Sequence, residues 1–149
     1  MDFLKSFANN RIFHVAALSW FVAQTIKVIH AFIVKGRFDF TRFVSSGGMP
    51  SSHASFVMGL TTAIGLIHGW DSTYFAISLS VSFVIMYDAA GVRRAVGKQA
   101  IILNRMLEDM QHKKKKIITE QRLKELIGHT PVEVFAGAIL GIIIANLMI

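Results

Sequence analysis

The sequence predicts an all-α protein, a small polytopic membrane helix bundle with about four transmembrane spans. The chain has 149 residues, of which 53% are hydrophobic, and its mean hydropathy is +0.51. It contains four apolar runs close to the roughly 20 residues that a helix needs to cross the bilayer core. These runs mostly lack the polar face at helical period that a soluble helix shows. We therefore expect one membrane-embedded domain covering residues 1–149.

The four predicted spans differ in length. The first covers residues 13–34 and is interrupted by polar side chains, including Lys27. The other three have only 16 to 18 residues each. Because the lower limit for a spanning helix is about 17 residues, we expect them to be thin or partly buried inside the bundle. They cover residues 54–69, 74–90 and 132–149.

The segment 91–128 has a different character from the spans. Apolar residues recur there at steps of three and four, which predicts an amphipathic helix outside the bilayer core. A lysine run follows at Lys113–Lys116, and we interpret it as a solvated surface near lipid headgroups. A shorter helix is expected from about Thr119. The apolar positions are Val96, Ala100, Leu103, Leu107 and Met110.

The charge distribution predicts the partners and the orientation. The net charge is +7, and in so apolar a chain an anionic membrane surface is a better partner than nucleic acid. Thirteen basic residues fall on one side of the predicted spans and two, Lys5 and Arg11, on the other. The positive-inside rule then predicts a multi-pass protein of the cell membrane, with the basic side in the cytoplasm. The thirteen are Lys35, Arg37, Arg42, Arg93, Arg94, Lys98, Arg105, Lys113, Lys114, Lys115, Lys116, Arg122 and Lys124.

Two junctions carry the candidate chemistry. The segment from Gly47 to His53 combines two glycines, a proline and two serines directly before an apolar run. This is typical of a tight loop leading into a helix N-terminus, where backbone N–H groups favour an anion. A second such junction runs from Gly128 to Glu133 and contains His129. Two histidines at the starts of two apolar helices indicate acid/base or nucleophilic chemistry on an anionic group.

Crossing parity predicts that these junctions meet. If the four spans are antiparallel, residues 35–53, 88–98 and 128–133 all lie at one membrane face. We therefore expect His53, Arg94 and His129 in one pocket. The planar guanidinium groups of Arg93 and Arg94 would suit phosphate oxygens. The alternative is an arginine pair that only anchors the end of a span.

Glu133 lies four residues after His129, so a helix start at Pro131 would bring the two side chains together. A carboxylate that holds one imidazole nitrogen leaves the other nitrogen free to attack. The chain has no cysteine, which excludes disulfides, thiolate catalysis and cysteine-ligated metal.

These strings resemble a known superfamily. Pro50-Ser51-Ser52-His53 is similar to the PSGH motif of the type 2 phosphatidic acid phosphatase superfamily, which includes vanadium haloperoxidases. The segment from His129 to Glu133 resembles the HxxxD part of its other motif, with Glu in place of Asp. GGMPSSH, YDAAGVRR and GHTPVEVFAG resemble more closely its small divergent branch of YuiD-like bacterial membrane proteins, from about Gln24 to the C-terminus.

The resemblance implies roles for single residues. His129 would attack phosphorus and form a phosphohistidine, Glu133 would orient it, and His53 would protonate the leaving oxygen. Ser51 and Ser52 would hold phosphate oxygens.

Several cations could replace the superfamily's arginine, whose position falls on Leu123. Arg93 or Arg94 is the favoured substitute. Lys35 and Arg42 match part of a further motif, in which Phe43 replaces proline. Lys27, inside the first span, is another candidate, because an intramembrane charge is costly and so indicates a partner.

We therefore predict a phosphatase that hydrolyses a lipid or prenyl phosphate or diphosphate, with no cofactor and no metal. The expected partners are membrane lipid and the phosphorylated substrate, with a homo-oligomer left open. One alternative is a non-catalytic membrane protein that binds anionic headgroups or a membrane partner. Another is a metal-dependent CDP-alcohol phosphotransferase, which the spacing of Asp88, Gly91 and Arg94 faintly resembles. Haloperoxidase activity is the least expected.

Overall fold

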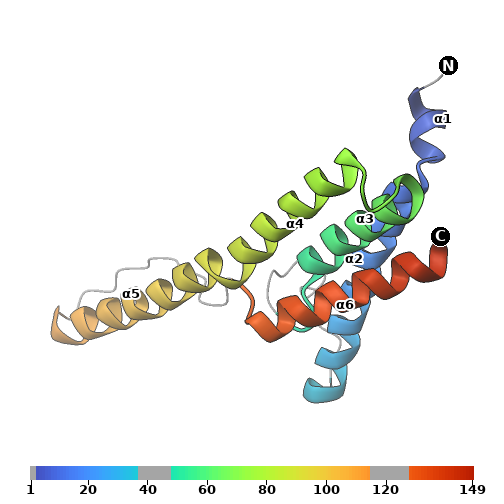
Figure 1. Ribbon diagram of the computed structural model, residues 1–149. Helices are drawn as coiled ribbons and strands as arrows, with labels where there is room; N and C mark the ends of the chain where they lie inside the picture. The colour runs from blue at the N-terminus through green and yellow to red at the C-terminus, as the bar shows by residue number, and fades with distance from the viewer. Residues whose placement is uncertain (1–2, 37–47, 115–127) are drawn as a thin grey trace.

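The computed structural model confirms the all-α prediction (Figure 1). It describes residues 3–36, 48–114 and 128–149, without the side chains of residues 3–4, 34–35, 93–94 and 107–114. These ranges contain six helices and no strand. The helices are α1 (Phe3–Ala8), α2 (Arg11–Lys35), α3 (Ser52–His68), α4 (Thr73–Ala90), α5 (Val92–Lys114) and α6 (Pro131–Met148).

Polar residues before the apolar runs start the four long apolar helices. In each case a side-chain oxygen at the N-cap accepts a hydrogen bond from the backbone N–H three residues on, which satisfies one of the four unpaired donors of a helix start. In a membrane an unpaired N–H is especially costly, so these caps fix where each helix begins. The caps are Asn10 for α2, Ser51 for α3, Ser72 for α4 and Thr130 for α6.

Helix α3 occupies the centre of the bundle and packs against α2, α4 and α6. Within the described residues, three helical stretches can cross a membrane by length and composition, namely Arg11–Ile33, Thr73–Met106 and Pro131–Met148. Helix α3 has only 17 residues. About half of them are buried, whereas only Ser78, Ser82 and Ala89 are buried in α4. The four predicted spans are therefore three outer helices and one short helix that the others surround.

Small residues allow α3 and α6 to approach closely. Gly137 and Gly141 are four residues apart on α6, and a Cβ atom at either would overlap a carbonyl oxygen of α3 or of its N-cap residue. The carbonyls belong to Ser51 and Ser55. A Cβ at Gly59 of α3 would in turn overlap the hydroxyl of Ser19 on α2. Since lipid supplies little hydrophobic force between helices, such close backbone contact is a main source of association.

The helix ends divide the bundle into two opposite ends. The Nη2 of Arg11, at the start of α2, donates a hydrogen bond to the carbonyl of Met148, at the end of α6, over 3.2 Å. The N- and C-terminal ends of the chain thus lie at one end of the bundle (Figure 1). The starts of α3 and α6, with His53 and His129, lie at the other.

Two elements differ from the four spans. Helix α1 is a short N-terminal helix that the hydrophobic pattern does not predict. Helix α5 extends away from the bundle beyond α4 (Figure 1). The helix predicted for segment 91–128 is found there, and the candidate membrane stretch Thr73–Met106 continues into it. The shorter helix expected from Thr119 lies outside the described residues.

Candidate active site

His129 lies at the junction that leads into α6, with its side chain 1% exposed. Its backbone N–H donates a hydrogen bond to the carbonyl of Ala89, near the end of α4, over 2.9 Å. Its Nδ1 lies 3.1 Å from Oε2 of Glu133. The backbone and the ring are therefore both held in place, the first by α4 and the second by the first turn of α6.

One carboxylate oxygen of Glu133, Oε2, takes part in two hydrogen bonds. Besides facing His129, Oε2 accepts the backbone N–H of Thr130 over 3.0 Å, while the Glu133 N–H donates to the Thr130 hydroxyl over 3.3 Å. This is a capping box, in which a Glu at the third helical position reaches back to the helix start. The extra methylene of Glu relative to Asp supplies the length for that reach, so the substitution fits the local geometry.

The remaining ring nitrogen of His129 is the unusual atom of the site. With Glu133 accepting from Nδ1, a neutral imidazole carries its lone pair on Nε2. Nε2 is fully buried, and none of the described groups forms a hydrogen bond with it. A buried polar atom without a partner costs about 1–3 kcal/mol, and such atoms mark sites where a ligand or a reacting group completes the bonding.

Burial lowers the pKa of His129 below its usual value, and the hydrogen bond to Glu133 opposes that shift. The positive charges of Lys27 and His53 lower this pKa further. The balance keeps the imidazole neutral near pH 7, which is the form that can attack an electrophile.

His53 faces His129 from the first turn of α3. The two ring centroids are 6.0 Å apart and the ring planes meet at 64°. His53 is half-buried, whereas His129 is buried. A phosphate-sized group beside the two rings would thus meet one enclosed nitrogen base and one more accessible imidazole.

The loop before α3 joins the two histidine junctions. Ser51 is fully buried, and its backbone N–H donates to the carbonyl of Glu133 over 2.9 Å. Its hydroxyl caps α3 by accepting the N–H of Ala54. The N-termini of α3 and α6 therefore lie side by side, and their partial positive charges favour an anion between them.

Lys27 supplies a buried cation from α2. It is 4% exposed, and its Nζ donates to the Oγ of Ser52 over 3.2 Å. A lysine in the apolar part of a membrane helix is costly unless it meets polar partners. Here Lys27 acts electrostatically on both Glu133 and His129. Of the candidate cations, Lys27 is the one whose side chain is described, and it belongs to the site.

The other candidate cations are described only in part. Arg93 and Arg94 lie in the first turn of α5, which follows the end of α4 near Ala89, but their side chains are outside the described residues. Lys35 is the last residue of α2, and the same holds for its side chain. Arg42 lies wholly outside.

Sequence reasoning missed three supporting groups. The Ala89 carbonyl has no sequence signal, since any residue provides one. The role of Gly137 could have been predicted, because two glycines four residues apart in an apolar run, Gly137 and Gly141, indicate close helix packing. The role of Thr130 could also have been predicted, because a Thr followed three residues later by a Glu predicts a capping box.

Within the described ranges, no group of three His, Cys, Asp or Glu side chains could hold a metal ion.

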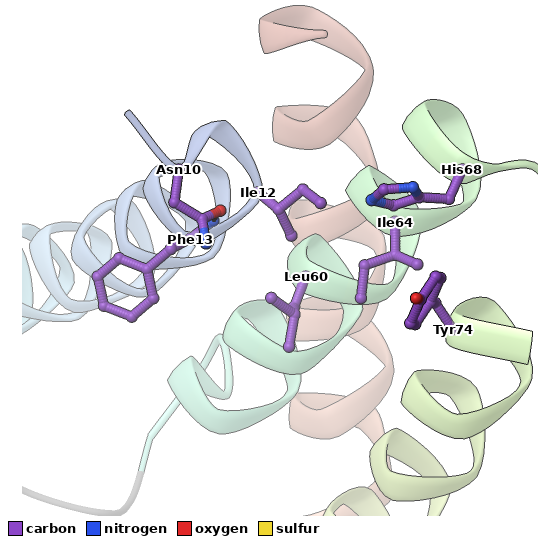
Figure 2. Close-up of a pocket in the computed structure, with 7 residues that line it drawn as sticks. All are labelled: Asn10, Ile12, Phe13, Leu60, Ile64, His68 and Tyr74. Carbon is purple, nitrogen blue, oxygen red and sulfur yellow. Dashed lines mark hydrogen bonds between the residues drawn. The ribbon is translucent and has the colours of Figure 1, made fainter. Parts of the chain in front are cut away.

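A cavity of about 350 Å³ lies at the other end of the bundle, between the start of α2, the end of α3 and the start of α4. Figure 2 shows His68 and Tyr74 on one side of it and Phe13 on the other. Its lining is mostly apolar and consists of Asn10, Ile12, Phe13, Leu60, Ile64, His68 and Tyr74.

Comparison with known proteins places this fold in a family. The Divergent PAP2 family model matches residues 8–144. The chain belongs to that family. It is 41% identical over 131 residues to YuiD, an uncharacterized membrane protein of Bacillus subtilis (strain 168), covering 82% of this chain and 83% of the relative. No solved structure matches it. With its long apolar helices, the chain is a PAP2-related, multi-pass membrane protein.

Proposed function

We propose that the protein is a metal-independent phosphatase of the membrane that hydrolyses a lipid or prenyl phosphate or diphosphate through a phosphohistidine. The observation that carries this proposal is the buried Nε2 of His129, which none of the described groups pairs. A carboxylate on the other ring nitrogen and a buried lysine nearby complete an arrangement suited to nucleophilic attack on a phosphate.

In the first step, Nε2 of His129 attacks phosphorus and the bond between phosphorus and the leaving oxygen breaks. The imidazolium that forms stays hydrogen-bonded to Glu133 through Nδ1–H. His53 gives its proton to the leaving oxygen, so that the product departs as an alcohol, or as a phosphate if the substrate is a diphosphate.

In the second step, a water molecule attacks the phosphohistidine. Neutral His53 now accepts a proton from the water, the bond between nitrogen and phosphorus breaks, and inorganic phosphate leaves. The ammonium of Lys27, the Ser52 hydroxyl and the N-terminus of α3 would stabilise the charge on the nonbridging oxygens in both steps.

The location follows from charge. The candidate site lies at the bundle end opposite Arg11, the end to which sequence assigned the thirteen basic residues. The positive-inside rule therefore favours the cytoplasmic face of the cell membrane. Labelling of a cysteine introduced at position 114 tests this, since a cytoplasmic site predicts no labelling from outside intact cells. Labelling at the rate of an external control would place the site on the outer face.

Phosphate release by the purified protein, measured against a panel of lipid and prenyl phosphates, tests the activity. We expect turnover that a chelator does not change, together with a protein-bound phosphate that acid removes. The non-catalytic alternative, a protein that binds anionic headgroups, keeps the two helix N-termini and Lys27 but does not need the unpaired Nε2. Headgroup binding without phosphate release from any member of the panel would favour that alternative.

A further inference from the structure

A mostly apolar groove of about 430 Å³ lies next to the candidate site. Helix α2 forms one wall and α6 the other, and these two helices pack against each other (Figure 1). Its lining contains one titratable side chain, that of His30. The lining residues are Ile26, His30, Met49, Pro50, Ala136, Ile139, Leu140 and Ile143.

The groove and the site are formed by neighbouring residues of the same three segments of the chain. Ile26 immediately precedes Lys27 on α2, and Pro50 immediately precedes Ser51. Ala136 follows Glu133 by three residues, so it lies on nearly the same face of α6. Lys27 and Glu133 therefore lie within one helical turn of residues that line the groove.

The groove also has a direction and an opening. From Ala136 to Ile143 it follows α6 for about 10 Å, away from the helix start and toward the interior of the predicted membrane. Several of its wall side chains are exposed, and in a membrane protein such side chains contact lipid. These are Ile26, Met49, Ile139 and Ile143. A chain can thus enter from the bilayer without leaving the apolar phase.

We propose that this groove holds the apolar chain of a single-chain phosphate ester, whose phosphate lies between Lys27 and His129. This inference rests on the proposed function. A cationic, polar end and an apolar trough match an amphiphile with one charged head. The volume is in the lower part of the range of about 300–1,000 Å³ typical of small-molecule sites, which suits one chain rather than two.

Filling the groove tests the proposal. Ala136→Phe places a ring between α2 and α6, next to the site. The matched control is Ala76→Phe, which adds the same ring at an exposed position on α4. We expect Ala136→Phe to raise KM for a long single-chain phosphate by at least about tenfold, while hydrolysis of a short, water-soluble phosphate ester changes little. The control should behave as the unmodified protein.

A second variant guards against a general folding defect. Ile143→Ala removes side-chain volume at the far end of the groove, so we expect the preference among single-chain phosphates to move toward longer chains. Equal loss of both substrate types in Ala136→Phe with no change of preference in Ile143→Ala would overturn the proposal. A two-chain phosphate used as well as the single-chain one, and equally affected by Ala136→Phe, would overturn it too.

A binding experiment separates this inference from the activity. A non-hydrolysable single-chain phosphonate with a photoreactive group in its chain is crosslinked to the full-length protein in lipid nanodiscs. We expect label on Ile26–His30 and Ala136–Ile143 that an unlabelled single-chain phosphate removes and the alcohol of the same chain does not. Label confined to α4, or unaffected by the phosphate competitor, contradicts the proposal. If groove labelling occurs without any hydrolysis, the proposed activity fails and the groove assignment stands.

Discussion

The two ends of the bundle each hold a histidine, His129 at one end and His68 at the other, yet the chemistry around the two rings differs. At one end His129 is buried, faces a carboxylate and lies near a buried lysine. At the other end His68 is exposed and packs against Tyr74, with ring centroids 5.4 Å apart. None of the described residues that line the cavity beside His68 is a carboxylate or a cation (Figure 2).

Both ends contain an imidazole, so the chemical difference between them comes from the groups that surround each ring. Water can satisfy the nitrogens of an exposed histidine, so they need no protein partner. Burial removes that water, and each nitrogen of His129 must then find a partner or stay unpaired at a cost. The fold supplies one partner, Glu133, and leaves Nε2 without one among the described residues. The energetic cost of an unpaired imidazole nitrogen therefore falls on His129 and not on His68.

The largest expected effect separates the two histidines. His129→Ala should remove all measurable phosphate release and the acid-labile protein-bound phosphate, because it deletes the nitrogen that attacks phosphorus in the proposed first step. His68→Ala should keep both, since it lies at the opposite end. Rapid-quench trapping of radiolabelled phosphate on the protein measures the intermediate directly. Residual labelling in His129→Ala would mean that another group is the nucleophile.

Glu133→Gln is expected to have the next largest effect. Gln keeps the reach of the side chain but removes the charge that stabilises the imidazolium, at a cost of up to about 10⁴-fold in kcat by analogy with orienting carboxylates. The pH profile gives a second readout. His129 must be neutral to attack, so kcat/KM falls as the pH drops through its pKa, and burial places that limb below about 6.5.

The direction in which Glu133→Gln shifts the pH profile follows from the interaction between Glu133 and His129. The hydrogen bond and charge of Glu133 raise the pKa of His129, so their loss should move the acidic limb of the profile to still lower pH. A limb displaced toward higher pH would show that Glu133 does not act on the attacking group. The matching change at the other end, Asp71→Asn, should leave the profile unchanged.

Lys27→Met ranks third. Removing one donor that stabilises developing charge costs about 10²–10³ in kcat in other enzymes, and we expect a similar loss here. Lys27→Arg should restore part of it, since the charge is kept. If Lys27 merely fills space, the Met variant, which has nearly the same length, should retain full activity in phosphate-release assays.

Much of this fold was predictable because its causes are local. The four long apolar helices begin at polar caps that are visible in the sequence, such as Ser51 and Thr130. Crossing parity then placed His53 and His129 at one end, and the structure brings their rings within 6.0 Å. Neither step requires knowledge of how the helices rotate about their axes.

What could not be predicted depends on that rotation and on close packing. Gln24, Lys27 and His30 all interrupt the first span, and no pattern in the sequence decides which of them faces the site. The structure directs Lys27 to Ser52 and leaves His30 in the wall of the groove. Likewise, the pairing of Ser51 N–H with the Glu133 carbonyl requires the approach that Gly137 permits, which is a relation between two helices.

The smallest expected effect compares two glycines that approach other groups closely. A Cβ at Gly137 would overlap the backbone carbonyl of Ser51, whereas a Cβ at Gly65 would overlap the ring of Trp70, near the other end of α3. Trp70 is 55% exposed, so its ring can turn aside. The Ser51 carbonyl cannot, because the N–H of Ser51 is bonded to α6 and its hydroxyl caps α3.

Gly137→Ala should therefore destabilise the protein by about 1–3 kcal/mol, as overpacking does elsewhere, and Gly65→Ala by clearly less. Thermal unfolding in one detergent measures both variants side by side. Equal losses of stability would mean that the two ends are packed with the same rigidity, and the contrast between them would then rest on charge alone.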